Sequence, residues 1–251
     1  MSEYIIEMLH ITKEFPGIIA NDDITLQLRK GEIHALLGEN GAGKSTIMKI
    51  LYGLYGLDEG EIFIRGQQVQ IKNPADAMAR GIAMIQQHFS LVPTHTAAEN
   101  IILGSVHGYI SLKDHNKKLE KIAKEYGFDV PMDRPVGELA VGQQQKVEIL
   151  KALYINAGVL IMDEPTASLD YGNQLRVLEQ VRSLSEQGYT VLLSTHDPQH
   201  ALRFSRRVLA LQGGRVAAEG DTRSVLTPDL IRQLYGVESV LLDTPDGAAL
   251  L

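Results

Sequence analysis

The sequence predicts an α/β fold: a mostly parallel sheet covered by helices, with an antiparallel β flank and an inserted helical sub-domain. Short apolar runs alternate with segments of helical period, which is typical of parallel sheets with helices on their faces. Near the start, strand-like runs lack the crossover helices that would join them in parallel, which indicates the flank. The middle of the chain carries helical patterns, which predict the insertion.

The elements of the N-terminal part follow from these patterns. The flank strands are expected at 4–9, 24–28 and 61–64. Residues 34–37 form an apolar run that leads into a glycine-rich loop, and residues 47–52 have the pattern of a helix. This strand–loop–helix order predicts the first unit of the parallel core.

The rest of the chain contains the insertion and then returns to the α/β pattern. Three helical patterns cover the middle, at 97–103, 112–126 and 142–154. We assign the inserted sub-domain to about 89–156, within a single domain of residues 1–251. A buried strand is expected at 159–162, a helix at 173–186 and a further strand at 190–194.

Composition narrows the classes of function. The 251 residues suit one large domain, and the lack of cysteine excludes disulfides and thiolate metal sites and fits a reducing compartment. The formal net charge of −7 argues against a nucleic-acid partner, because such proteins normally carry a basic face. No apolar run approaches ~18 residues, and the first residues do not resemble a secretory leader, so we expect no direct membrane insertion. A cytoplasmic protein is expected, peripheral to the cytoplasmic face of the membrane only through a partner.

The strongest chemical signal is the sequence GENGAGKST, which matches G-x-x-x-x-G-K-[ST] between a predicted strand and a predicted helix. Its members are Gly38, Glu39, Asn40, Gly41, Ala42, Gly43, Lys44, Ser45 and Thr46. Such a loop wraps a phosphate with backbone N–H groups, and the helix that follows adds a positive dipole. Lys44 is expected at the β- and γ-phosphates, and the Ser45 hydroxyl on Mg²⁺. An ordinary glycine-rich turn is the alternative, and the flanking strand and helix disfavour it.

Two carboxylates follow the predicted strand at 159–162. Asp163 is expected to hold the metal, directly or through water. Glu164 is expected to accept a proton from the attacking water or to orient it. The pair is weak evidence alone, because strands often end in acidic residues.

The runs EPTASLD at 164–170 and STHD at 194–197 make the comparison specific. With the motifs above, they resemble the ATP-binding cassette family over essentially the whole chain. The resemblance implies a P-loop NTPase core that binds ATP and Mg²⁺, with Asp163 at the metal and Glu164 as the catalytic carboxylate. It also implies that Asp170 acts across a dimer of two copies and that His196 contacts the γ-phosphate. His200 is interpreted as a residue on a helix surface.

The same resemblance assigns two further positions. Gln87, in IQQHFSLVP, aligns with the family's glutamine that meets the metal or the attacking water, and Gln86 is the other candidate. Phe15 matches the aromatic residue that stacks on adenine, since stacking needs only a π face. A phenylalanine of the core is the alternative for Phe15.

The segment LAVGQ at 139–143 departs from the family's pattern. The family usually has Ser-Gly-Gly-Gln here, and Ala140 and Val141 replace the serine and the first glycine. The resemblance implies that Ala140, Gly142 and Gln143 address the γ-phosphate held by the other copy, through N–H groups and a helix dipole. The missing hydroxyl predicts a lower rate or a weaker ATP-bound dimer.

The two ends of the chain resemble different branches of this family. Up to about residue 154 the chain is similar to the first cassette of simple-sugar and nucleoside importers, as in GENGAGKSTIMKILYGLY. From about residue 160 it is similar to cassettes of iron-siderophore, haem or cobalamin importers, as in STHDPQHALRFSRRVLALQGGRV. All 12 lysines lie at or before Lys151, whereas 8 of the 12 arginines follow it. We infer a chimera joined between Lys151 and Asp163.

The expected function is ATP hydrolysis by the nucleotide-binding subunit of an importer. Its expected partners are a second copy of the chain, head to tail, and a separate transmembrane permease subunit. An engineered chimeric domain with no physiological transport partner is the alternative. An ATPase acting on DNA or ribosomes is disfavoured, because the chain is acidic and has no sustained heptads.

Overall fold

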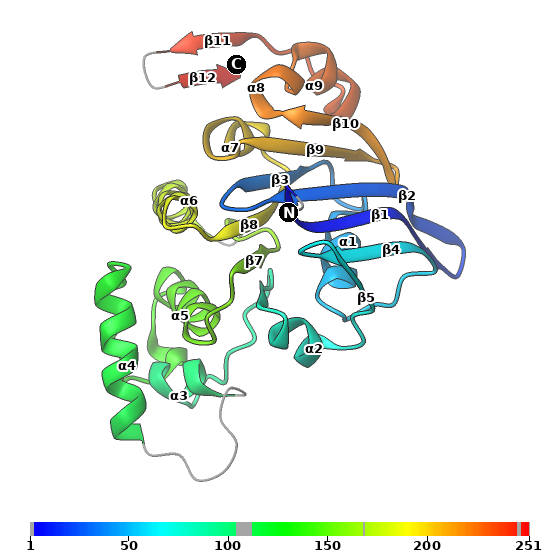
Figure 1. Cartoon of the computed structure of the whole chain (residues 1–251). Helices are drawn as coiled ribbons and strands as arrows, with labels where there is room; N and C mark the ends of the chain where they lie inside the picture. The colour runs from blue at the N-terminus through cyan, green and yellow to red at the C-terminus, as the bar shows by residue number, and fades with distance from the viewer. Residues whose placement is uncertain (1–2, 104–111, 168, 245–246, 251) are drawn as a thin grey trace.

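The computed structural model describes residues 3–103, 112–167, 169–244 and 247–250. It is a mixed α/β fold, with a six-stranded sheet, a four-stranded antiparallel sheet and a C-terminal hairpin (Figure 1). This confirms the predicted fold class.

The six-stranded sheet has the order β10-β9-β3-β8-β7-β6. Its strands are β3 (Ile33–Leu37), β6 (Ile82–Ile85), β7 (Val159–Met162), β8 (Thr190–Thr195), β9 (Arg207–Gln212) and β10 (Arg215–Asp221). All neighbours are parallel except β10, which is antiparallel to β9. Every residue of β3, β6, β7 and β8 is buried. Continuous burial is typical of parallel strands covered on both faces.

The antiparallel sheet is the predicted flank, in the order β2-β1-β4-β5. Its strands are β1 (Tyr4–Phe15), β2 (Ile18–Arg29), β4 (Glu59–Ile64) and β5 (Gln67–Val69). β1 and β2 have 12 residues each and are longer than expected, because their hairpin continues to a turn at Pro16 and Gly17. Helix α1 (Lys44–Leu51) shares one apolar core with this sheet and with one face of the parallel sheet.

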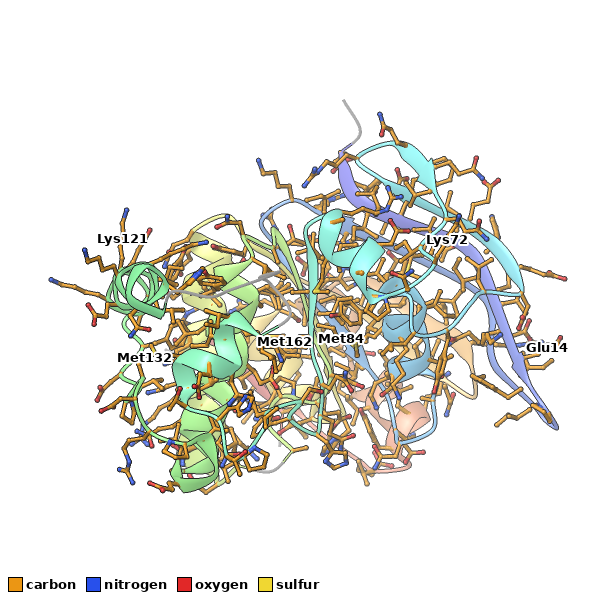
Figure 2. The ribbon with its side chains drawn as sticks, turned by 90° about the horizontal axis from the view of Figure 1, so that it is seen from below. Glu14, Lys72, Met84, Lys121, Met132 and Met162 are labelled. Atoms are coloured by element: carbon orange, nitrogen blue, oxygen red, sulfur yellow. The ribbon has the colours of Figure 1, made fainter. Side chains whose placement is uncertain are left out.

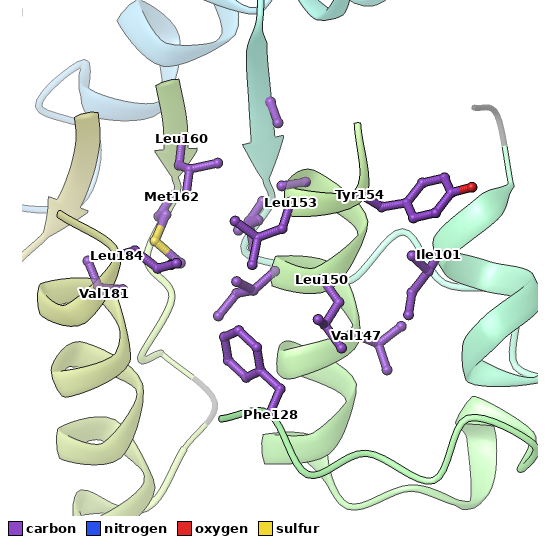
Figure 3. Close-up of a cluster of buried hydrophobic side chains, with 14 of the residues drawn as sticks. Ile101, Phe128, Val147, Leu150, Leu153, Tyr154, Leu160, Met162, Val181 and Leu184 are labelled. Atoms are coloured by element: carbon purple, nitrogen blue, oxygen red, sulfur yellow. The ribbon is translucent and has the colours of Figure 1, made fainter. Parts of the chain in front are cut away.

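Helices α5 (Val141–Tyr154) and α6 (Tyr171–Glu186) cover the other face of the parallel sheet. Figure 3 shows how Leu150 of α5 and Leu184 of α6 share a core with Met162 of β7. Figure 2 places Met84 and Met162, which belong to neighbouring strands, near the middle of the molecule. The sheet and α5 therefore hold the ends of β6 and β7 in fixed positions.

The remaining helices and a C-terminal hairpin complete the fold. α2 (Pro74–Ala79) precedes β6, and α3 (Ala97–Ile102), α4 (Leu112–Glu125) and the 3₁₀ turn η1 (Val136–Glu138) lie between β6 and α5. These helices fall inside the proposed sub-domain of 89–156, whose bounds stay a prediction. α7 (Pro198–Phe204), α8 (Thr222–Val225), α9 (Pro228–Tyr235) and the hairpin of β11 (Leu241–Thr244) and β12 (Gly247–Leu250) follow β8. Across the described ranges, no helix has the length and apolar character needed to cross a bilayer.

Candidate functional site

The glycine-rich loop joins the end of β3 to the start of α1. Gly38 has φ 153° and Gly43 has φ 101°. A Cβ atom would lie 2.3 Å from the Leu211 carbonyl oxygen at Gly38 and 2.4 Å from the Ala20 carbonyl oxygen at Gly43. Both positions therefore require glycine, for backbone conformation and for space. Gly43 also leaves the N-terminus of α1 without a side-chain cap, which keeps this helix start open to an anion.

Lys44 turns back onto its own loop. Its Nζ donates hydrogen bonds to the carbonyl oxygens of Gly38, at 2.7 Å, and Glu39, at 3.0 Å. The same Nζ lies 3.3 Å from Oε1 of Glu164. Lys44 and Glu164 border a cavity of about 150 Å³, which is lined by Ile18, Ala20, Asn40, Gly41, Gly43, Lys44, Ser45, Thr46, Gln87 and Glu164. The structure thus brings most of the glycine-rich motif together with Gln87 and Glu164.

Asp163 stands at the end of β7, where two hydroxyl groups reach it. Its Oδ1 accepts hydrogen bonds from Ser45 Oγ, at 2.9 Å, and from Ser194 Oγ, at 2.8 Å. Ser194 lies in β8, which neighbours β7 in parallel, so the carboxyl ends of both strands meet here. The sequence gives Ser194 no role of its own, although its place near the end of a predicted strand is a signal that it lies close to Asp163.

The oxygen atoms at Asp163 fit a Mg²⁺ ion that takes most of its ligands from phosphate and water. Ser45 Oγ and Asp163 Oδ1 are hard oxygen ligands within hydrogen-bond distance of each other. Among the residues that the structure describes, no cluster of three His, Cys, Asp or Glu side chains could hold a metal ion. Mg²⁺ usually binds through one or two carboxylates, with phosphate and water oxygens as its other ligands. The site fits that pattern.

Glu164 is held from several sides. Its N–H donates to Ser194 Oγ, at 2.8 Å, and its Oε2 lies 2.7 Å from Nδ1 of His196. The side chain is 8% exposed, whereas that of His196 is 55% exposed. Glu164 has φ 48°, a left-handed conformation that costs a non-glycine residue about 1–3 kcal/mol. The surrounding contacts fix this carboxylate beside the cavity despite that cost.

Gln87 and Gln86 line different cavities. Gln87 borders the cavity of Lys44 and Glu164. Gln86 borders a separate cavity of about 200 Å³, together with Glu148 and Lys151 of α5. The geometry therefore favours Gln87 of the two candidates.

Phe15 lies at the end of β1 and is half-buried. Its ring meets Tyr55 edge-on, with centroids 5.3 Å apart. Ile18 and Ala20 of β2 line the cavity, and Ile18 is the strand partner of Phe15. The partial exposure leaves part of the ring available for stacking.

The segment at 139–143 forms the start of α5. Ala140 is the exposed N-cap, without a side-chain hydrogen bond, and its carbonyl oxygen accepts from Gln143 N at 2.8 Å. A Cβ atom on Gly142 would lie 3.7 Å from Oδ1 of Asn173, whose Nδ2 donates to Asp170 at 2.7 Å. Asp170 and the start of α5 are therefore neighbours, and neither lines the Lys44 cavity.

Asp170 caps α6 by accepting a hydrogen bond from Asn173 N at 2.9 Å. Hydrogen bonds from the backbone and side chain of Asn173 lower the pKa of the Asp170 carboxyl. Asp170 is thus an exposed carboxylate fixed at the surface beside α5.

The interpretation of His200 as a surface residue is wrong. His200 is 6% exposed, and burial lowers the pKa of its imidazole. α7 packs against β3 on one side and contacts β12 on another, so most of its residues are buried. The burial of His200 comes from tertiary packing of α7, which the local sequence pattern does not show.

Comparisons with known proteins agree with the motifs. The family model described as ABC transporter matches residues 21–167. The guanosine import ATP-binding protein of Bacillus subtilis is 44% identical over 94% of this chain and 47% of its own length. The ribose import ATP-binding protein of Caldanaerobacter subterraneus is 40% identical over 94% of this chain and 48% of its own length. The chain spans about half the length of these curated relatives.

Solved structures share the fold. An ATP-binding cassette of an ABC transporter in its ADP conformation superposes with a TM-score of 0.83, at 26% identity, over 94% of this chain and 100% of the solved one. A dimeric cassette in a post-hydrolysis state, bound to ADP and phosphate, has a TM-score of 0.74 at 28% identity, over 87% of this chain and 99% of that one.

Proposed function

The chain belongs to the ABC transporter family, and from that premise we propose that it binds and hydrolyses MgATP between two copies of itself arranged head to tail. The observation that carries the proposal is the carboxylate of Glu164, held between Lys44 at 3.3 Å and His196 at 2.7 Å beside the glycine-rich loop. A base, a cation and a histidine meet where the terminal phosphate of a nucleotide would lie.

Binding of the triphosphate uses the loop from Gly38 to Thr46. Lys44 exchanges its contacts with the Gly38 and Glu39 carbonyls for the β- and γ-phosphates, and the open start of α1 faces the anion. Ser45 and Asp163, with Gln87, would hold Mg²⁺, which supplies charge neutralisation when bound. Phe15 stacks on the adenine ring. The observation that supports this role is the partial exposure of the phenylalanine ring.

Hydrolysis uses Glu164 and His196. A water molecule attacks the γ-phosphorus, and its proton passes to the Glu164 carboxylate. The bond between the γ-phosphorus and the β,γ-bridging oxygen breaks, which gives ADP and phosphate. His196 contacts the γ-phosphate and keeps Glu164 aimed at the water through their hydrogen bond.

The second copy completes the site. Gly142 lies beside Asn173, which contacts Asp170, and the lining of the Lys44 cavity includes none of Ala140, Gly142 and Gln143. In a head-to-tail dimer the start of α5 would present its N–H groups to the γ-phosphate of the other copy. The similarity to a cassette solved as a dimer with ADP and phosphate supports this arrangement.

The coupled process is import of a small solute through a separate transmembrane permease, at the cytoplasmic face of the membrane. The support is the naming of the relatives as guanosine and ribose import ATP-binding proteins. The solute class proposed is a simple sugar or a nucleoside.

The chimera stays an alternative, and the lysine boundary at Lys151 is the observation that favours it. The nucleoside- and sugar-importer relatives cover 94% of the chain and so extend to both sides of the proposed join at 151–163. Transport assays with a sugar- or nucleoside-type and a siderophore- or cobalamin-type permease distinguish the readings. Coupling to the former supports the importer, and coupling to neither supports a chimera without a partner.

The proposed ATPase function is tested by phosphate release from MgATP by the purified chain. Release that requires Mg²⁺ and disappears in Lys44→Ala supports the proposal. Absence of release at any protein concentration up to the solubility limit contradicts it.

A further inference from the structure

A buried carboxylate in α5 contacts the segment that follows Gln87. The Glu148 side chain is 5% exposed, and its Oε1 accepts a hydrogen bond from Ser90 N at 2.8 Å. Its Oε2 lies 3.7 Å from Nζ of Lys151, which donates to the Ser90 carbonyl oxygen at 3.2 Å. Side chains one turn apart in α5 therefore bind both backbone polar groups of Ser90.

The segment after Ser90 is also fixed to a helix. Asn100 of α3 is 1% exposed. It accepts a hydrogen bond from Val92 N at 2.7 Å and donates to the carbonyl oxygens of Val92, His95 and Thr96 at 3.0–3.2 Å. Gln87 lies three residues before the anchor at Ser90 and reaches the cavity of Lys44 and Glu164. The contacts of Glu148 and Lys151 with Ser90 therefore fix the backbone three residues after Gln87.

The burial of Glu148 opposes its charge. Its neighbours Val147, Ile149 and Leu150 are buried apolar residues. Burial raises the pKa of the Glu148 carboxyl, and Lys151 and the Ser90 N–H act against that rise. An apolar residue of similar volume at such a position is often neutral or stabilising, so stability alone does not account for a carboxylate here. Its contacts point to the segment of Gln87.

We infer that Glu148 is a positioning residue for Gln87: by holding Ser90 it fixes the segment that carries Gln87 into the nucleotide cavity. The inference rests on the proposed ATPase function. α5 also begins at the residues proposed to contact the nucleotide of the other copy, Ala140 and Gly142. Glu148 lies eight residues after Ala140, about two helical turns along the same rigid element. It therefore links the position of Gln87 to the position of the helix start.

The test uses a fluorescent reporter in the segment itself. The chain has no tryptophan, so Phe89→Trp introduces a single indole between Gln87 and Ser90. In this background Glu148→Ala and Glu148→Gln are compared with Glu32→Gln. Glu32 is a matched control: a buried carboxylate, 4% exposed, that accepts from Arg29 N at 2.7 Å at the start of β3. Readouts are kcat, KM, the Kd for ATP, the melting temperature and the fluorescence anisotropy of the indole.

Glu148→Ala is expected to lower kcat about tenfold or more, because small displacements of an active-site group are costly. The Kd for ATP is expected to change less than about twofold, since Glu148 contacts Ser90 and Lys151 and not Lys44. The anisotropy of the indole should fall. Glu148→Gln should recover most of kcat and of the anisotropy, because its side-chain oxygen still accepts from Ser90 N. Glu32→Gln should lower only the melting temperature.

Several results would overturn the inference. One is an unchanged kcat and anisotropy in folded Glu148→Ala, and another is an equal loss in Glu32→Gln. If Glu148→Ala does not fold, Lys151→Met is used instead, because it removes the donor to the Ser90 carbonyl oxygen. This variant should also lower kcat and the anisotropy of the indole. No change in either quantity refutes the role. Should the parent chain release no phosphate, the proposed function fails, while the anisotropy still decides whether Glu148 orders the segment of Gln87.

Discussion

The Nδ1 atom of His196 lies 2.7 Å from the Oε2 atom of Glu164, although 32 positions separate the two residues in the chain. Each follows a strand of the parallel sheet, β8 and β7, and these strands are neighbours. Their carboxyl ends meet at one edge, where the glycine-rich loop after β3 also lies. The hydrogen bond therefore follows from the strand order.

His196→Ala is expected to leave ATP binding intact and to lower turnover about 100-fold or more, as loss of one group that stabilises a transition state typically does. Glu164 also loses its partner at 2.7 Å. Phosphate release and calorimetric ATP affinity check this. The control is His10→Ala, an exposed histidine paired with Asp23 in the antiparallel sheet, which should change neither quantity. A parental rate in His196→Ala would remove the residue from the mechanism.

Lys44→Ala is expected to weaken MgATP binding at least tenfold. A hydrogen bond to a charged group contributes about 1.5–3 kcal/mol, and Lys44 is the cation of the loop that lines the cavity. Lys49→Ala is the matched control, because Lys49 belongs to the same helix and its Nζ lies 5.6 Å from the ring of Tyr55 instead. Calorimetric titration measures both. Equal affinities for the parent and Lys44→Ala would refute the phosphate assignment.

Glu164→Gln is expected to keep ATP binding and to lose turnover by about 10²–10⁴-fold, because an amide cannot take the proton of the attacking water. A longer-lived ATP-bound dimer should follow, visible by size-exclusion chromatography. Glu179→Gln, on the surface of α6, serves as the control. Turnover by Glu164→Gln at the rate of the parent would show that another group is the base.

Ala140→Ser is expected to act in two ways. A serine at this uncapped N-cap should stabilise α5 by about 0.5–2 kcal/mol. It should also add a hydroxyl contact to the γ-phosphate of the other copy, worth up to about tenfold or somewhat more in rate or dimer lifetime. Ala140→Asp separates the two effects, since aspartate caps as well but repels the phosphate. If both variants raise the melting temperature and neither changes the rate, the hydroxyl has no role at the nucleotide.

Much of the fold could be predicted because the core strands are continuous apolar runs and the larger helices have clear periods. The strand predicted at 159–162 has the observed bounds of β7. The strands and helices after β8 are short and the sequence does not predict them, and the burial of His200 in α7 depends on tertiary packing. Residues of contiguous motifs, such as Lys44 and Asp163, were identified as site candidates from their neighbours in sequence.

Other contributions to the site could not be read from the chain. Ser194 reaches Asp163 only because β7 and β8 are adjacent, and Glu148 reaches Ser90 only because α5 packs beside the end of β6. Asn21 of β2 donates to the carbonyl oxygen of Gly43 at 3.2 Å, which joins the antiparallel sheet to the glycine-rich loop. Each is a polar side chain whose partner is set by tertiary packing, which no local pattern records.

The central claim is that two copies of the chain form the ATPase site together. Its most direct test is the rate of phosphate release per chain, measured against chain concentration at saturating MgATP. If the start of α5 in one copy completes the Lys44 site of the other, the rate per chain rises with concentration. It levels off once nearly all chains are in the dimer. Mixing in excess Glu164→Gln chain would then change the rate per active site. Two results together would contradict the claim. The rate per chain would stay constant with concentration, starting from concentrations at which light scattering detects only the monomer, and the Glu164→Gln chain would leave that rate unchanged.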